Sequence, residues 1–145
     1  MTANQTAEKS PVERPVKVRA QLHVVINVGA PFGTGDLSFV ATGTGQNPPG
    51  GPVRSQAEGF MNFGRKGLAI VSGSGTVTEA DGDQTFFKVE PDGSTTITGG
   101  TGKFTGASGR LGLPTNVGDP VAVYDAAAGT VTIDVTQTAE GTIIY

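Results

Sequence analysis

Strict alternation of apolar and polar residues constrains this chain more than any other feature. Between residues 16 and 28, valine, alanine, leucine and isoleucine occupy every second position, and mainly polar residues stand between them. A β-strand directs successive side chains to opposite faces, so this run predicts one long amphipathic strand. No segment of helical length shows apolar residues spaced three and four apart. The chain is therefore expected to be all-β.

Shorter alternating runs follow, separated by glycine, proline and aspartate. They predict further strands at 36–44, 53–63, 68–78, 83–90, 94–98, 110–113, 120–124 and 130–145. Asp81-Gly82 lies between two of these runs and is the strongest hairpin signal in the chain. Paired prolines and glycines in 45–52 predict an irregular rim loop, and 99–109 predicts a tight glycine-rich corner.

Length and composition predict one domain. A chain of 145 residues with 36% hydrophobic residues can bury one core but is short for two domains. Residues 1–15 are polar and show no periodicity. They predict a flexible tail or a lid in front of a domain at 16–145.

Charge and cysteine content exclude several functions. A net charge of −3 with only 16% charged residues provides no basic footprint for a nucleic acid backbone. The absence of cysteine removes disulfides, thiolate catalysis and thiolate metal sites, and one histidine with scattered carboxylates shows no metal-ligand spacing.

No apolar run approaches the roughly 20 residues of a membrane helix, and the N-terminus has no apolar leader. A soluble cytoplasmic protein without metal, cofactor or membrane partner is expected.

A sandwich and a barrel would both produce several short alternating strands. Two features favour a small closed antiparallel barrel. Glycines stand inside strands at Gly59, Gly73, Gly75 and Gly141, where barrel strands bend. The first and last predicted strands are also long enough to pair and close the sheet.

The run Gly100-Thr101-Gly102-Lys103 is similar to the end of a phosphate-binding loop. That loop requires a glycine where Ile97 stands and a serine or threonine where Phe104 stands. It also requires a following helix, whereas a strand is predicted here. A cluster of turns is the better interpretation.

Several predicted strands carry both aromatic and polar residues. Alternate residues of a barrel strand face the lumen, and aromatic walls with a few polar groups are typical of a small-molecule pocket. The predicted substrate-binding residues are Phe39, Phe60, Asn62 and Phe86, and the predicted catalytic or orienting residues are His23, Glu58, Lys88 and Tyr124. The single histidine is either a proton relay or a residue on the polar face of its strand. The pattern leaves open which face is turned inward, and an apolar inner face would fill the barrel and leave these residues on the surface.

The segment ITGGTGKFTGASG, from Ile97 to Gly109, resembles a glycine-rich segment of allene oxide cyclases and, more loosely, a turn of plant dirigent proteins. Weaker similarities occur in the same order, and together they span residues 22–110. They are Gly35-Asp36-Leu37, Phe63-Gly64 with the run from Leu68 to Gly73, and Phe86-Phe87 after the acidic hairpin. The resemblance implies an antiparallel barrel of about eight strands with a cavity, assembled as a dimer or a trimer. It also implies that a reactive intermediate is held in one folded geometry, as in the small barrels that serve bacterial polyketide pathways as Diels–Alder-type cyclases.

The chain departs from allene oxide cyclases at their catalytic positions. Its first strand, LHVVINV, has no glutamate, and no cysteine matches the one in their pocket. Allene oxide cyclisation is therefore not inferred. The expected function is a cofactor-independent cyclase or isomerase that acts on an apolar natural-product or lipid-like intermediate in the lumen, for example in a Diels–Alder-type polyketide cyclisation. The alternatives are a binding or steering barrel without chemistry and a structural protein with a filled barrel.

Overall fold

The computed structural model describes residues 10–46, 51–65 and 67–145. Within them it shows β-strands and a single turn of 3-10 helix, so the all-β prediction is confirmed. The strands are β1 (Glu13–Asn27), β2 (Ser38–Gln46), β3 (Pro52–Gly64), β4 (Gly67–Glu79), β5 (Gln84–Val89), β6 (Thr95–Gly100), β7 (Ser108–Leu111), β8 (Thr115–Asp125) and β9 (Thr130–Ile144), with the 3-10 turn η1 (Gly102–Phe104) between β6 and β7. No helix in these residues is long and apolar enough to cross a membrane.

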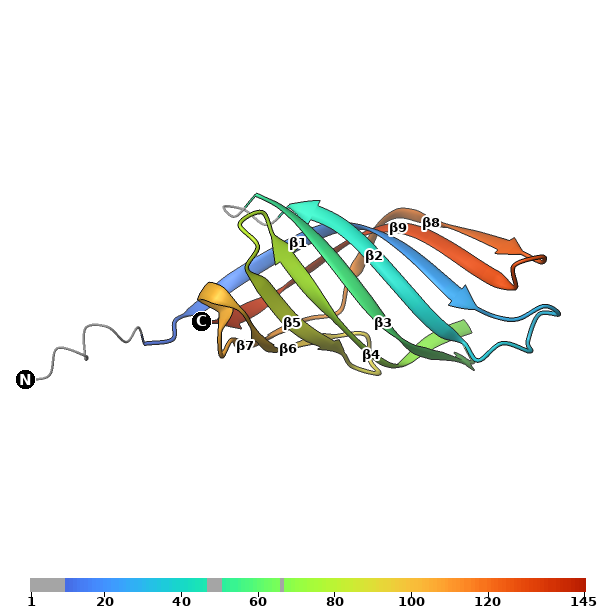
Figure 1. The fold of residues 1–145 in the computed structure, drawn as a ribbon, viewed down its shortest axis with the longest axis horizontal. Helices are drawn as coiled ribbons and strands as arrows, with labels where there is room; N and C mark the ends of the chain where they lie inside the picture. Colours follow the sequence, from blue (N-terminus) through green and yellow to red (C-terminus); the bar gives the residue numbers. More distant parts are fainter. Residues whose placement is uncertain (1–9, 47–50, 66) are drawn as a thin grey trace, which may run out of the picture.

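All the strands belong to one antiparallel sheet whose hydrogen bonds form a ring (Figure 1). Strands β1 to β7 pair in sequence order, β7 pairs with the end of β9, and β9 pairs with β1 from Glu13↔Ile144 to Asn27↔Thr130. The first and last strands thus close the ring, as their lengths predict. β1 begins at Glu13, inside the predicted tail, because β9 offers partners as far as Ile144. Residues 1–9 of that tail and residues 47–50 of the predicted rim loop lie outside the described residues.

Strands β7 and β8 share one edge of β9. β7 pairs with residues 141–144 of β9, and β8 pairs with residues between 130 and 138. The sheet continues from β4 through the short strands β5 and β6 to β7, and among the described residues neither β5 nor β6 pairs with β8. Within the described residues, β8 therefore has β9 as its one hydrogen-bonded neighbour, and residues 67–72 of β4 have only β3. The ring closes where β7 and β1 pair with β9. At its other end, with the β1–β2 loop and the tips of β8 and β9, the outer edge of β8 and residues 67–72 of β4 have no strand beside them among the described residues (Figure 1).

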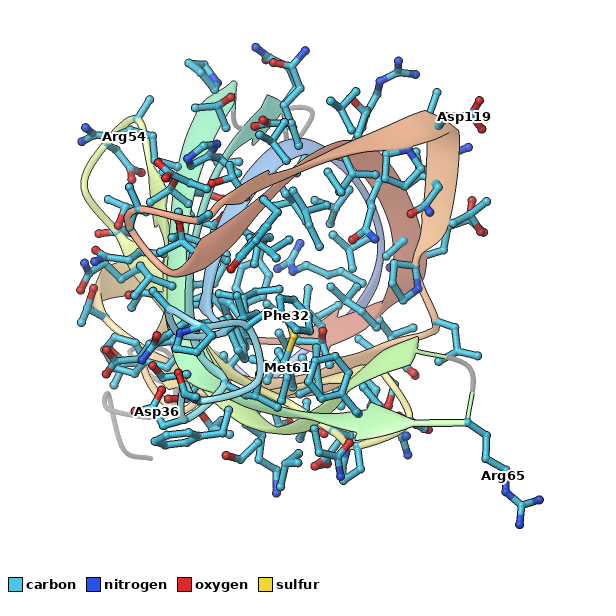
Figure 2. The ribbon with its side chains drawn as sticks, turned by 90° about the vertical axis from the view of Figure 1, so that its right-hand side faces the viewer. Phe32, Asp36, Arg54, Met61, Arg65 and Asp119 are labelled. Atoms are coloured by element: carbon cyan, nitrogen blue, oxygen red, sulfur yellow. The ribbon has the colours of Figure 1, made fainter. Side chains whose placement is uncertain are left out.

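The apolar face of β1 is turned inward. Ile26 and Val28 are fully buried and pack with Phe39 of β2. Figure 2 shows Met61 near the centre of the ring and Arg54 directed away from it. The structure thus settles the orientation that the alternation alone left open.

The glycine-rich segment forms the corner that the sequence predicts, and its lysine is held by the acidic β4–β5 hairpin. The Nζ atom of Lys103 lies 2.7 Å from a carboxylate oxygen of Glu79 and 2.9 Å from one of Asp81. A carboxylate oxygen of Asp83 is 4.0 Å away. Glu79 is buried. Lys103 therefore connects the corner to the hairpin. The lysine that makes this segment similar to a phosphate-binding loop has a structural role here.

The acidic neighbours of Lys103 give this contact a predictable pH dependence. Hydrogen bonding to Glu79 and then to Asp81 raises the pKa of Lys103 above its usual value of 10.5. Hydrogen bonding to Lys103, with a smaller effect of the Asp83 N–H, holds the pKa of Asp81 below 3.8. The contribution of Asp81 to stability is therefore present above its unfolded pKa and lost as the pH falls through its lowered folded pKa. The contribution of Lys103 is present below 10.5 and lost as the pH rises through its raised folded pKa.

We expect Lys103→Met to lower the free energy of unfolding most between about pH 5 and pH 9, where both charges are present. Urea unfolding of the variant and the wild type at about pH 7 and pH 3 measures the difference. The matched control is Lys17→Met, because the Lys17–Glu140 pair, at 3.4 Å, is highly exposed and such pairs contribute little. A loss of equal size at both pH values would contradict an ionic role for Lys103.

Candidate functional site

Three aromatic side chains from distant parts of the chain meet at the open end of the ring. Phe32 lies in the loop between β1 and β2, Phe63 near the end of β3, and Tyr124 in β8. The ring centroid of Phe32 is 5.8 Å from that of Phe63 and 5.4 Å from that of Tyr124, with the second pair edge-to-face. These separations are typical of aromatic pairs that attract each other. Phe32 therefore bridges β3 and β8, which are not hydrogen-bonded to each other.

This aromatic cluster (Phe32, Phe63 and Tyr124) combines mutual contact with solvent exposure. The exposed fractions of the three residues are 53%, 52% and 44%. Aromatic surface left in water is unfavourable, so a ligand that covered the cluster would gain free energy from burying it. Figure 2 looks onto this end and shows Phe32 near the middle of the ring beside Met61. The cluster is therefore an accessible apolar surface over the ring interior.

The interior next to the aromatic cluster is apolar. The partly buried side chains of Met61, Ile70, Val131 and Ile133 pack against the buried residues near the end of β1. Tyr124 pairs with Val131, so both share the inner face of the sheet. The hydroxyl of Tyr124 is the one polar side-chain group in the aromatic cluster, and it can donate or accept a hydrogen bond.

Hydrogen bonds within the β1–β2 loop stabilise the conformation that carries Phe32. The carbonyl of Val28 accepts the N–H of Gly33 at 2.8 Å and that of Gly35 at 3.0 Å. The carboxylate of Asp36 accepts the backbone N–H of Ser38 at 2.9 Å, and this bond is the main cause of the lowered pKa of Asp36. The loop therefore presents its phenylalanine at a fixed place over the ring.

The structure separates the site residues predicted from the sequence. Phe39 and Tyr124 are on the inner face, where Phe39 is buried in the core. The others are exposed on the outer face, because they alternate with the inward apolar residues of their strands; they are His23, Glu58, Phe60, Asn62, Phe86 and Lys88. The structure therefore divides the predicted set between the two faces. On the outer face, Glu58 and Phe86 line one groove and His23 lines the groove next to it. The catalytic roles of all these residues stay predictions.

His23 has a carboxylate partner on the outer face. Its Nδ1 atom lies 2.7 Å from Oδ1 of Asp134, and both side chains are about half exposed. The contact arises because the β1–β9 register places Asp134 directly opposite His23. The sequence alone did not point to this partner, since the two residues are 111 positions apart and only strand pairing joins them. No group of three or more metal-ligating side chains is found in the described part of the chain.

Phe32, Phe63 and Asp134 are absent from the predicted site. Phe32 lies in a glycine-rich loop outside the predicted strands, where no periodic signal points to it. Phe63 is the last residue of the strand predicted at 53–63 and shares a face with Met61. Phe32 and Phe63 come close to Tyr124 only when the ring closes, and a local sequence pattern carries no information about that closure.

Comparisons of the chain with protein-family models, curated proteins and solved structures find no match. The resemblance to allene oxide cyclases therefore rests on the glycine-rich segment and the weaker sequence similarities around it.

Proposed function

We propose that this protein holds an apolar or amphipathic small molecule against the aromatic cluster at the open end of the ring and steers it into one folded geometry. The observation that carries the proposal is that three contacting aromatic side chains stay about half exposed over an apolar interior. Small-molecule sites are mostly apolar, with a few polar groups that fix orientation. Tyr124 supplies such a group.

A cofactor-independent cyclisation or isomerisation fits this arrangement. These reactions require that the reacting ends of one molecule are held close together, and a shaped apolar surface provides this without a strong acid or base. The hydroxyl of Tyr124 would polarise a substrate carbonyl by hydrogen bonding. The resemblance to allene oxide cyclases is a further support, and a Diels–Alder-type polyketide cyclisation belongs to this class of reaction.

Binding or steering without chemistry is the second candidate. The observation that favours it is the single polar side chain of the aromatic cluster, because orientation needs no more than that. Assembly into a dimer or a trimer stays a prediction, and the exposed valines of β8, Val117, Val121 and Val123, are apolar surface that such an assembly would cover.

We expect the wild type to bind cis-parinaric acid, a fluorescent polyene fatty acid, and Phe32→Ala to bind it about tenfold more weakly. Removing one aromatic wall sacrifices roughly 1.5 kcal/mol of apolar contact, which corresponds to that change in affinity. Fluorescence titration measures the dissociation constant, and a thermal shift checks that the ligand stabilises the native state. The matched control is Phe60→Ala, because Phe60 is 50% exposed, much like Phe32, but lies on the outer face.

Three results separate the alternatives. Equal affinities of the two variants, or a larger loss in Phe60→Ala, would reject the open end as the site. With an intramolecularly cyclisable polyene as probe, chromatography of the recovered molecule distinguishes an enzyme from a binder, since cyclisation leaves the mass unchanged. Failure of the wild type to bind any such polyene would favour a structural protein.

A further inference from the structure

The outer face of the sheet carries a long polar depression. One groove of about 610 Å³ crosses from β9 over β1, β2, β3 and β4 to β5. A second groove of about 350 Å³ lies over β3 to β6, and Gln56 and Thr76 line both. The two grooves therefore adjoin and form one elongated depression, the outer trough. It lies on the opposite face of the sheet from the apolar interior.

Hydroxyl and amide groups dominate the lining of the larger groove. Pairs of threonines separated by one residue direct their hydroxyls to the same face of β2 and β4. Within the described residues the following lining side chains make no hydrogen bond: Gln21, Thr42, Thr44, Gln56 and Thr76. Each can both donate and accept, so together they match a ligand rich in hydroxyl groups, which also donate and accept.

An arginine that has no side-chain partner among the described residues stands in the middle of this lining. The strand register places Arg54 between Thr44 on β2 and Thr78 on β4. Its guanidinium makes no ion pair or side-chain hydrogen bond to any described residue, and Figure 2 shows it directed away from the ring. Asp134, the carboxylate that lines the same groove, is already paired with His23. A guanidinium binds a carboxylate through two parallel hydrogen bonds, so Arg54 is suited to a carboxylate from outside the chain.

We propose that the outer trough binds an acidic saccharide, with a carboxylate of the sugar on Arg54 and its hydroxyls on the threonine and glutamine side chains. The adjoining groove adds Phe86, whose exposed ring offers apolar surface to the C–H face of a sugar. Glu58 also lines this groove, and its carboxylate accepts hydrogen bonds from sugar hydroxyls but repels a second acidic group, so the acidic sugar is placed in the larger groove. The elongated shape and the repeated hydroxyl partners favour a short chain of sugars over a single small anion. This inference concerns the opposite face of the sheet from the aromatic cluster and does not rest on the function proposed there.

The test uses oligogalacturonate as the probe and the full chain labelled for NMR. We expect its addition to shift the backbone amide signals of Thr42, Thr44 and Arg54, and Arg54→Gln to weaken binding about tenfold or more. The matched control is Arg65→Gln, which removes the same charge from an exposed arginine at another place on the ring (Figure 2). Arg65→Gln and Phe32→Ala are both expected to leave binding of the saccharide unchanged.

Three outcomes would overturn the proposal. The first is an absence of shifts among amides of the outer trough. The second is an equal loss of binding in the two arginine variants, which would show general attraction of a polyanion. The third is equally tight binding of an uncharged malto-oligosaccharide, which would remove the role of the carboxylate.

Discussion

Replacing Ile26 with alanine is expected to lower the free energy of unfolding by about 2–5 kcal/mol. Ile26 is fully buried near the end of β1 and packs with Val28 and Phe39. The substitution removes buried apolar surface and leaves a cavity that its neighbours fill only in part. Urea unfolding followed by circular dichroism at about pH 7 measures the effect. This is the most direct test that the apolar face of the strand is turned inward.

The neighbouring valine provides the control. Val25 lies on the outer face of the same strand and is less buried than Ile26. Val25→Ala is therefore expected to cost about 1 kcal/mol or less. Similar losses of stability in both variants would mean that the apolar face is not the inner one. The aromatic cluster would then not lie over an apolar interior, and the proposed ligand site would be rejected. If Ile26→Ala does not fold, Ile26→Val, with an expected cost of about 0.5–1.5 kcal/mol, serves in its place.

Gly75→Ala is expected to destabilise the ring by about 1–3 kcal/mol, although alanine normally stabilises a strand relative to glycine. A Cβ atom at Gly75 would overlap the backbone carbonyl oxygen of Gln56, and would lie 2.7 Å from Cζ of Phe87 and 2.8 Å from Cβ of Ala57. These two residues pair with Gly75 from β5 and β3, so the backbone of the sheet fixes their positions on either side. Relief of the overlap requires the Phe87 ring and a strand to shift, and this cost exceeds the gain in backbone entropy. Thermal unfolding by calorimetry measures the change.

Gly64→Ala is the matched control, because among the described residues a Cβ atom there meets no atom nearer than the carbonyl oxygen of Gly67, at 3.5 Å. It is expected to be neutral or stabilising by about 0.5–1 kcal/mol. If Gly64→Ala is destabilised as much as Gly75→Ala, close packing around Gly75 is not the cause of its loss of stability.

The two proposed sites use the two faces of one sheet. The aromatic cluster is apolar and lies over the interior, whereas the outer trough is polar and contains Arg54. Alternation along each strand produces this division, because neighbouring residues must point to opposite faces. Variants of Phe32 and Arg54 are therefore expected to act independently, as substitutions at distant sites usually do.

Much of the fold follows from local sequence. The alternation predicts most strands to within a few residues, but the strand predicted at 120–124 is part of the longer β8 (Thr115–Asp125). Asp81-Gly82 does form the β4–β5 turn, where the N–H of Gly82 donates to the carbonyl of Glu79 at 2.9 Å. The glycine-rich run predicts the corner at η1, and the strand predicted after it at 110–113 is found as β7, where a phosphate loop would need a helix. Periodicity and turn chemistry are local properties, which explains why a single sequence is enough to predict them.

Candidate site residues were much harder to predict than strands. Phe60, Asn62 and Lys88 share strands with inward-facing residues, but a pattern of period two identifies two faces without naming the inner one. The inner face is recognised from the burial of its residues. Burial depends on which strands surround a residue after the ring has closed. The predicted site therefore included residues of both faces.

The sequence by itself determined the class of the fold, the strands, the hairpin and the glycine-rich corner, because each depends on residues close together in the chain. Only the tertiary structure decided which face is inward, that Phe32 meets Phe63 and Tyr124, and that Asp134 stands opposite His23. The physical reason is strand register. Pairing of β1 with β9 and the unequal lengths of the other strands bring distant residues together. These relations are set by the closed sheet as a whole.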